Sequence, residues 1–234
     1  MIGADWLGPA EWEAVRLSLR VAFWATLASL PLGVLTAYAL ARWAFPGKTL
    51  LNGLVHLPLI LPPVVTGYLL LIALGRRGPV GQVLEAWFGI VLAFRWTGAA
   101  VAAAVMAFPL MVRVIRLAIE AVDPKLEAAA ATLGASRAWV FATITLPLIA
   151  PGIVAGAILA FAKAIGEFGA TITFVSNIPG QTQTVPSAIH AALQVPGGED
   201  AAARLVIVAI VIAVGALALS ELVARRVARR VAGA

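Results

Sequence analysis

The sequence predicts an all-α, polytopic membrane protein: a helical bundle of five core spans, or six if a further span is hidden between residues 166 and 194. The first observation behind this is composition. Hydrophobic residues make up 62% of the 234-residue chain and charged residues only 12%, whereas soluble proteins average roughly 45–50% and 25%. The second observation is a series of apolar runs, because about 20 apolar residues suffice to cross a bilayer as a helix.

Five runs are long enough to span. They lie at about residues 15–41, 50–74, 97–119, 144–165 and 201–223. The second run contains Pro58, Pro62 and Pro63, which cannot donate backbone hydrogen bonds, so we expect this span to be bent or broken. The stretch 166–194 is too polar and too interrupted for a simple helix. We interpret it as the end of the fourth span followed by a partly re-entrant or external segment.

The basic residues indicate how the chain is oriented. If the C-terminus is cytoplasmic, five crossings place ten lysines and arginines on the inside, four of them at 225–230, and six on the outside. Cytoplasmic flanks of spans are enriched in positive charge, so we expect a cytoplasmic C-terminus and an external N-terminus. The net charge of +6 comes from scattered residues and not from one basic face, which argues against nucleic-acid binding. We expect membrane lipid to surround the chain.

The loop at 123–142, between the third and fourth spans, predicts two short helices joined at a glycine. Asp123 is a good N-cap and Pro124 a good first helical residue. Gly134 can end the first helix in a left-handed conformation, and Ser136 can cap the second. We expect Pro147 to open the fourth span.

Apolar residues in the first of these helices share one face. Leu126, Ala129, Ala130 and Leu133 recur at helical spacing. A helix of this kind can pack into a groove of another protein, or it can lie on the membrane surface. The residues alone favour neither interpretation.

The same loop resembles the EAA loop of bacterial ABC-importer permeases. The resemblance rests on E-A-A at 127–129, a glycine seven residues after the glutamate, and I-x-L-P at 144–147. In that family the loop is a coupling helix that docks into a cleft of the ATPase subunit. The resemblance implies that Glu127 meets a basic group of the ATPase and that Gly134 sets the turn. The coupling residues that it implies are Glu127, Ala128, Ala129, Gly134 and Pro147.

The end of the fourth span carries an ionisable pair. Lys163 and Glu167 lie four residues apart and so share a helix face. A charge at mid-membrane costs about 2.5–3.5 kcal/mol on insertion scales. Two interpretations remain open: a self-neutralising packing pair, or a position in a pore or gate. The acid alone would repel an anion.

The residues after this pair are small or hydroxyl-bearing. Such side chains suit a narrow polar conduit, although small residues also allow close helix packing. The candidate pathway or gate residues are Lys163, Gly166, Glu167, Phe168, Gly169, Thr171 and Thr173.

A second resemblance concerns the substrate. The run 166–190 looks like the corresponding stretch of molybdate permeases, and 56–71 and 108–123 are similar to the same proteins. Sulfate permeases share its first five residues. The resemblance covers essentially the whole chain as one transmembrane domain, residues 1–234. It implies the type I ABC-importer fold and a homodimer of permeases on two ATPases, which bind ATP and Mg. A periplasmic or extracellular oxyanion-binding protein would supply the anion.

These features predict a permease of the bacterial cytoplasmic membrane that moves molybdate by alternating access. A tungstate or sulfate permease shares every feature, and an ATP-independent channel or secondary transporter is the alternative from another class. Catalysis is not expected, because His56 and His190 lie far apart and no HExxH or GxSxG motif occurs. The run Gly47-Lys48-Thr49 lacks the first glycine of a P-loop, since Arg42 stands there. With no cysteines, disulfides and cysteine-bound metals are excluded, and we expect no cofactor or metal in this chain.

Overall fold

The computed structural model describes residues 6–231, and every regular element within that range is a helix. The all-α prediction is therefore confirmed. In chain order the elements are α1 (Pro9–Arg42), α2 (Lys48–Ile60), α3 (Pro63–Leu74), α4 (Pro79–Phe88), α5 (Trp96–Glu120), α6 (Pro124–Thr132), α7 (Arg137–Val140), the π-helical turn η1 (Phe141–Thr145), α8 (Leu146–Ile165), α9 (Gly169–Val175), α10 (Val185–Ala192) and α11 (Glu199–Val231).

Four helices are long and apolar enough to cross a membrane: α1, α5, the continuous helix Arg137–Ile165, and α11. The helices α2 and α3 form a fifth span if this pair, bent by 116°, is counted as one. The bend follows from the prolines. Leu61 is extended, with φ −72° and ψ 143°, because a residue before proline avoids the helical region, and neither Pro62 nor Pro63 can donate the next helical bond. The expected break in this span is confirmed.

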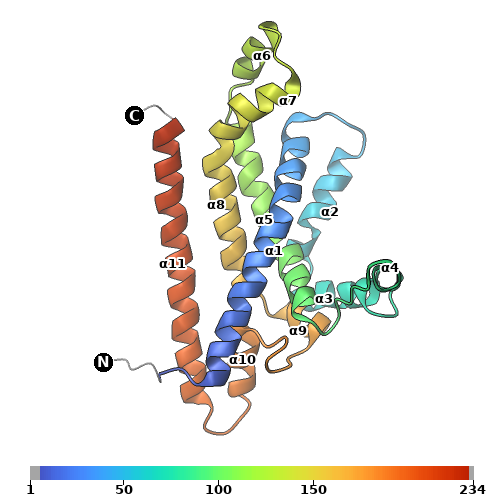
Figure 1. Ribbon diagram of the computed structural model, residues 1–234, viewed down its shortest axis with the longest axis vertical. Helices are drawn as coiled ribbons and strands as arrows, with labels where there is room; N and C mark the ends of the chain where they lie inside the picture. The colour runs from blue at the N-terminus through green and yellow to red at the C-terminus, as the bar shows by residue number, and fades with distance from the viewer. Residues whose placement is uncertain (1–5, 232–234) are drawn as a thin grey trace.

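The core of the bundle is built around α5, which packs against α1 and α8, while α11 packs against α8 (Figure 1). Small side chains allow this close approach: Ala99, Ala102 and Ala103 of α5 have no exposed surface. The loop of α6 and α7 lies beyond one end of the bundle, which we call the α6 end. Helix α11 ends there, and α1 begins at the opposite end.

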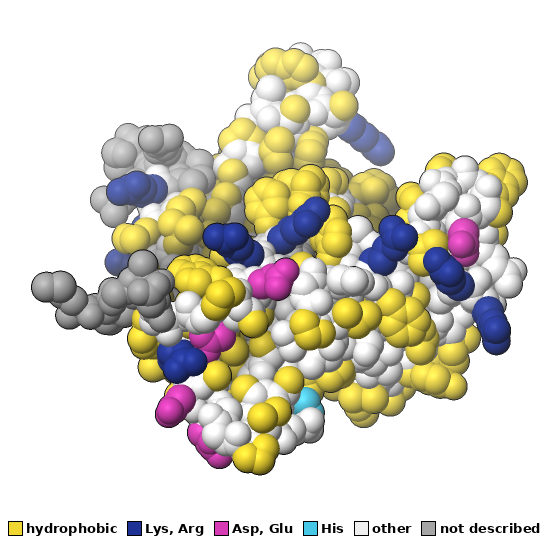
Figure 2. All heavy atoms as spheres, turned by 60° about the horizontal axis from the view of Figure 1, so that its bottom comes forward, with side chains coloured by type: hydrophobic (Ala, Val, Ile, Leu, Met, Phe, Trp, Pro, Cys, Tyr) yellow, Lys and Arg dark blue, Asp and Glu magenta, His cyan; other side chains and the backbone are white. Residues whose placement is uncertain are grey.

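The stretch 166–194 forms the short helices α9 and α10 and, within the described residues, no further span. Helix α9 packs on α3, and α10 packs on α11 and α1. Helix α4, which lies between the second and third apolar runs of the sequence, exposes 80% of Trp87 and 68% of Phe88. Figure 2 looks onto the end opposite to α6, where basic side chains are spread among hydrophobic ones without forming one patch.

Candidate coupling and translocation sites

The first helix of the predicted coupling loop is capped at both ends as its residues suggest. The side chain of Asp123 accepts a hydrogen bond of 2.9 Å from the backbone N–H of Lys125. Gly134 has φ +85°, its N–H donates to the carbonyl of Ala131, and the next N–H donates to that of Ala130. This is a Schellman ending, which glycine permits because it has no Cβ.

The second helix differs from the prediction. Ser136 does cap it, accepting a bond of 3.3 Å from the Trp139 N–H, but α7 runs without interruption through η1 into α8. Pro147 therefore does not open the span, which begins at Arg137. The π turn, in which Leu146 N–H donates to the carbonyl of Phe141, has a physical reason: a proline ring collides with the carbonyl four residues earlier, and a wider turn moves that carbonyl away.

The loop presents apolar side chains to its surroundings. No residue of α6 is buried, Leu126 is 48% exposed, Leu133 88% and Trp139 62%. Ala128 and Ala129 are exposed as well. Because α6 and α7 stand beyond the bundle (Figure 1), the part of the chain that the structure describes does not cover these side chains. Grouped exposed apolar residues of this kind are typical of a protein interaction site.

Glu127 faces the other way, toward its own bundle. Its Oε1 accepts a hydrogen bond of 2.7 Å from Thr145 Oγ1 and lies 3.7 Å from the guanidinium of Arg42, which also donates to the carbonyl of Val122. The expected contact between Glu127 and an ATPase stays a prediction. The sequence reasoning missed Arg42 and Thr145 as partners, because nothing local in the sequence connects the end of α1 with a helix so far along the chain.

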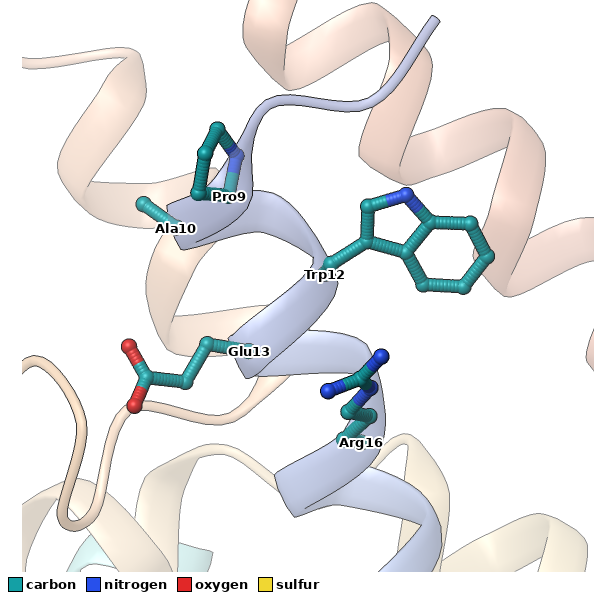
Figure 3. Close-up of a pocket in the computed structure, with 5 residues that line it drawn as sticks. All are labelled: Pro9, Ala10, Trp12, Glu13 and Arg16. Carbon is teal, nitrogen blue, oxygen red and sulfur yellow. The ribbon is translucent and has the colours of Figure 1, made fainter. Parts of the chain in front are cut away.

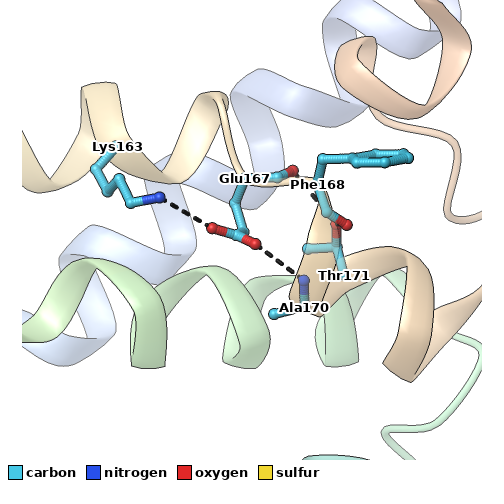
Figure 4. A network of polar contacts seen from close by, with 5 residues as sticks. All are labelled: Lys163, Glu167, Phe168, Ala170 and Thr171. Carbon is cyan, nitrogen blue, oxygen red and sulfur yellow. Dashed lines mark hydrogen bonds and ion pairs between the residues drawn. The ribbon is translucent and has the colours of Figure 1, made fainter. Parts of the chain in front are cut away.

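The pair Lys163 and Glu167 is brought together by the turn after α8 (Figure 4). Lys163 Nζ lies 3.1 Å from one carboxylate oxygen of Glu167, and the other accepts a bond of 3.0 Å from the Ala170 N–H. Glu167 is only 2% exposed, and a carboxylate near the first turn of a helix is favoured by the free N–H groups there. This geometry describes a structural pair that fixes the start of α9. A role in the pathway stays a prediction.

The candidate residues around that pair lie at a sharp reversal of the chain. Gly166 ends α8 and is exposed. Phe168 precedes α9, and the centre of its ring lies 5.1 Å from that of His190. These two aromatic rings connect the reversal with α10.

The remaining candidates pack α9 against α3. The hydroxyl of Thr171 donates to the carbonyl of Phe168 just before α9, at 2.9 Å, and that of Thr173 to the carbonyl of Gly169, at 2.8 Å. A Cβ built on Gly169 would lie 2.7 Å from Cβ of Pro63 in α3, and one built on Gly67 would lie 2.5 Å from a backbone oxygen of α9. In this single chain the small residues therefore serve helix packing.

An open pocket of about 670 Å³ lies on the first turns of α1 (Figure 3). It is lined by Pro9, Ala10, Trp12, Glu13 and Arg16. It lies at the end opposite to α6, so it is separate from the coupling loop. Among the described residues, no group of three or more side chains could hold a metal ion.

Comparison with known proteins places these features in a family. Residues 29–233 match the model of the binding-protein-dependent transport system inner membrane component. The chain is 62% identical over 215 residues to the molybdenum transport system permease protein ModB of Escherichia coli K12, covering 92% of this chain and 94% of that one. It is 54% identical over 220 residues to ModB of Haemophilus influenzae, covering 94% and 96%.

Solved structures share the fold. A bacterial ABC transporter that imports the acidic polysaccharide alginate matches with a TM-score of 0.71 at 19% identity, covering 96% of this chain and 86% of that one. The fold is that of type I ABC-importer permeases. The chain belongs to the family of binding-protein-dependent transport system inner membrane components, which are multi-pass proteins of the inner membrane.

Proposed function

We propose that this chain is the permease subunit of an ATP-driven importer that carries molybdate across the bacterial cytoplasmic membrane by alternating access. The observation that carries the proposal is the loop of α6 and α7, which presents an exposed apolar surface beyond the membrane-spanning bundle in a member of this family. Molybdate is favoured because relatives at 62% and 54% identity are molybdenum permeases.

Three kinds of partner complete the importer. Two ATPase subunits bind ATP and Mg and receive the coupling loops, which lie with the C-terminus in the cytoplasm. A periplasmic or extracellular protein binds the oxyanion and docks at the opposite end of the bundle. A second copy of the chain forms a homodimer. Helix α3 supports this, since Val64, Val65 and Tyr68 are 55%, 40% and 55% exposed and need a partner or lipid to cover them.

The anion passes beside the reversal after α8. Movement of the coupling loops switches the spans between inward- and outward-facing arrangements, a packing change between discrete states. The site needs little affinity for the anion, because tight binding would slow its release. The pairing of Lys163 with Glu167 agrees with this, since the charge of Lys163 is already neutralised by the carboxylate.

Reconstitution tests the proposal directly. The permease, its ATPase and its binding protein are placed in proteoliposomes, and uptake of molybdate, tungstate and sulfate is measured by mass spectrometry of the metal or by radiolabel. We expect molybdate uptake that needs both ATP and the binding protein. Uptake that persists without ATP would identify a channel or secondary transporter. Faster uptake of sulfate or tungstate at equal concentration would show that this anion, and not molybdate, is the preferred substrate.

A further inference from the structure

We propose that Arg42, Glu127 and Thr145 form a tether that fixes the coupling helix α6 to the first and fourth spans and transmits its movement to both. The inference rests on the proposed function and assigns positioning roles to two residues, Arg42 and Thr145, that lie outside the exposed apolar surface of the loop. In this arrangement, the carboxylate of Glu127 contacts Arg42 and Thr145 of its own chain.

Helix α6 has little else to hold it. None of its residues is buried, and it packs mainly on α7 and η1. A helix normally gains most of its stability from an apolar face buried in tertiary packing, and α6 has no such face among the described residues. Its position relative to the bundle is therefore set by the turns at its two ends and by Glu127.

The three side chains come from the end of α1, from α6 and from the early part of the fourth span. Thr145 has no exposed surface, and the side chains of Arg42 and Glu127 are 18% and 21% exposed. A pair this sheltered is screened by salt less than an exposed one. Arg42 is the last residue of α1, and through its 2.9 Å bond to the carbonyl of Val122 it also contacts the chain just after α5.

Thr145 places the other end of the tether at an irregular point of the fourth span. It is the last residue of the π turn η1, and π turns inside α-helices are frequent at functional sites. Its 2.7 Å bond to Glu127 therefore acts where the helical hydrogen bonding already departs from the regular pattern. A shift of α6 pulls on α1 through the ion pair and on the fourth span through the hydroxyl.

Charge reversal tests the ion pair. Arg42→Glu, Glu127→Arg and the double swap are assembled with ATPase and binding protein in proteoliposomes, and molybdate taken up per ATP hydrolysed is measured. We expect each single reversal to lower this ratio about tenfold, within the usual range of coupling between sites. The swap restores the charge pair but loses the bond that Arg42 donates to the carbonyl of Val122, because a carboxylate cannot donate, so we expect it to recover the ratio several-fold but not fully. Lys48→Glu is the matched control: Lys48 is half-buried near the same end, its Nζ donates to the carbonyl of Trp43, and its reversal should leave the ratio unchanged.

Thr145→Val tests the second connection without altering either charge. Since it removes only the hydroxyl that Glu127 accepts from, we expect a several-fold lower ratio with the ATPase still bound. A swap no better than the single reversals, or single reversals equal to wild type, overturns the tether. If the reversals prevent assembly, Thr145→Val decides, and an unchanged ratio overturns it. A wild-type complex without ATP-dependent uptake would instead contradict the proposed function.

Discussion

The crossing of α3 and α9 leaves no room for a methyl group at Gly67. A Cβ placed there would lie 2.5 Å from the backbone oxygen of Ala170, 2.9 Å from its Cα and 2.9 Å from Cβ of Thr173. Two of these atoms belong to the backbone, so no side-chain rotation can make space. The helices must separate by nearly 1 Å before ordinary contact distances near 3.4 Å are reached.

Gly53 provides the matched control, because it lies within α2 and nothing lies within 4 Å of its Cβ position. Alanine is favoured over glycine in a helix by about 0.8–1.0 kcal/mol, which applies to both positions. Overpacking typically costs about 1–3 kcal/mol and applies to Gly67 alone. We therefore expect Gly67→Ala to be less stable than Gly53→Ala by about 1–3 kcal/mol.

Thermal unfolding of the purified permease in one detergent measures this difference. For chains of this length about 1 kcal/mol shifts Tm by roughly 2–4 °C, so Gly67→Ala should melt at least roughly 2 °C below Gly53→Ala. Both variants are compared at equal protein concentration, since dimer formation also changes Tm. Equal Tm values, or a higher Tm for Gly67→Ala, would show that α3 and α9 do not meet as closely as the structure places them.

Three further predictions concern the loop, the buried acid and the orientation. Gly134→Val should abolish ATP-dependent uptake with membrane insertion intact, because a positive φ strains a β-branched residue by about 1–3 kcal/mol; Gly47→Val, with φ +86° and equally free space in the turn between α1 and α2, is the control and should transport normally. Glu167→Ala should lower Tm by an amount equivalent to about 1.5–3 kcal/mol, the usual value of hydrogen bonds to a charged group, and an unchanged Tm would mean that the acid does not fix α9. Because the chain has no cysteine, single cysteines report topology: Asp200→Cys should react with an impermeant maleimide in intact cells and Lys125→Cys only after permeabilisation, and the reverse pattern would invert the orientation.

The sequence predicted the long spans well because hydropathy is a property of each segment alone. The third span, expected at 97–119, is Trp96–Glu120. The ends are less accurate, for a physical reason. Helix α1 begins at Pro9, before its apolar run, because Glu11 is 8% exposed and paired with Arg204. Hydropathy alone treats such a buried, neutralised acid as if it were loop.

The coupling loop was predictable to the level of single caps, since Asp123, Gly134 and Ser136 act on neighbouring backbone groups. What depends on distant parts of the chain was not predictable. The inward orientation of Glu127 requires the end of α1, and the packing role of Gly169 requires the start of α3. Assignment of the loop to an ATPase, and of the single domain to residues 1–234, stays a prediction.

The break between α2 and α3 and the chain reversal after α8 lie against each other, and this limits what can surround them. The break before Pro62 and the reversal at Gly166 are joined by the contact of Gly169 with Pro63. Irregular backbone within a bilayer is tolerated only where protein buries it or where it lines a water-filled cavity, because freed polar groups cost several kcal/mol in hydrocarbon. Gly166 is exposed in the single chain, so at bilayer depth it needs protein or water as its neighbour. In the proposed homodimer, a second copy covering α3 and α9, with water between the copies, would satisfy both interruptions at once, and the anion's path would then run beside the residues that the sequence analysis named.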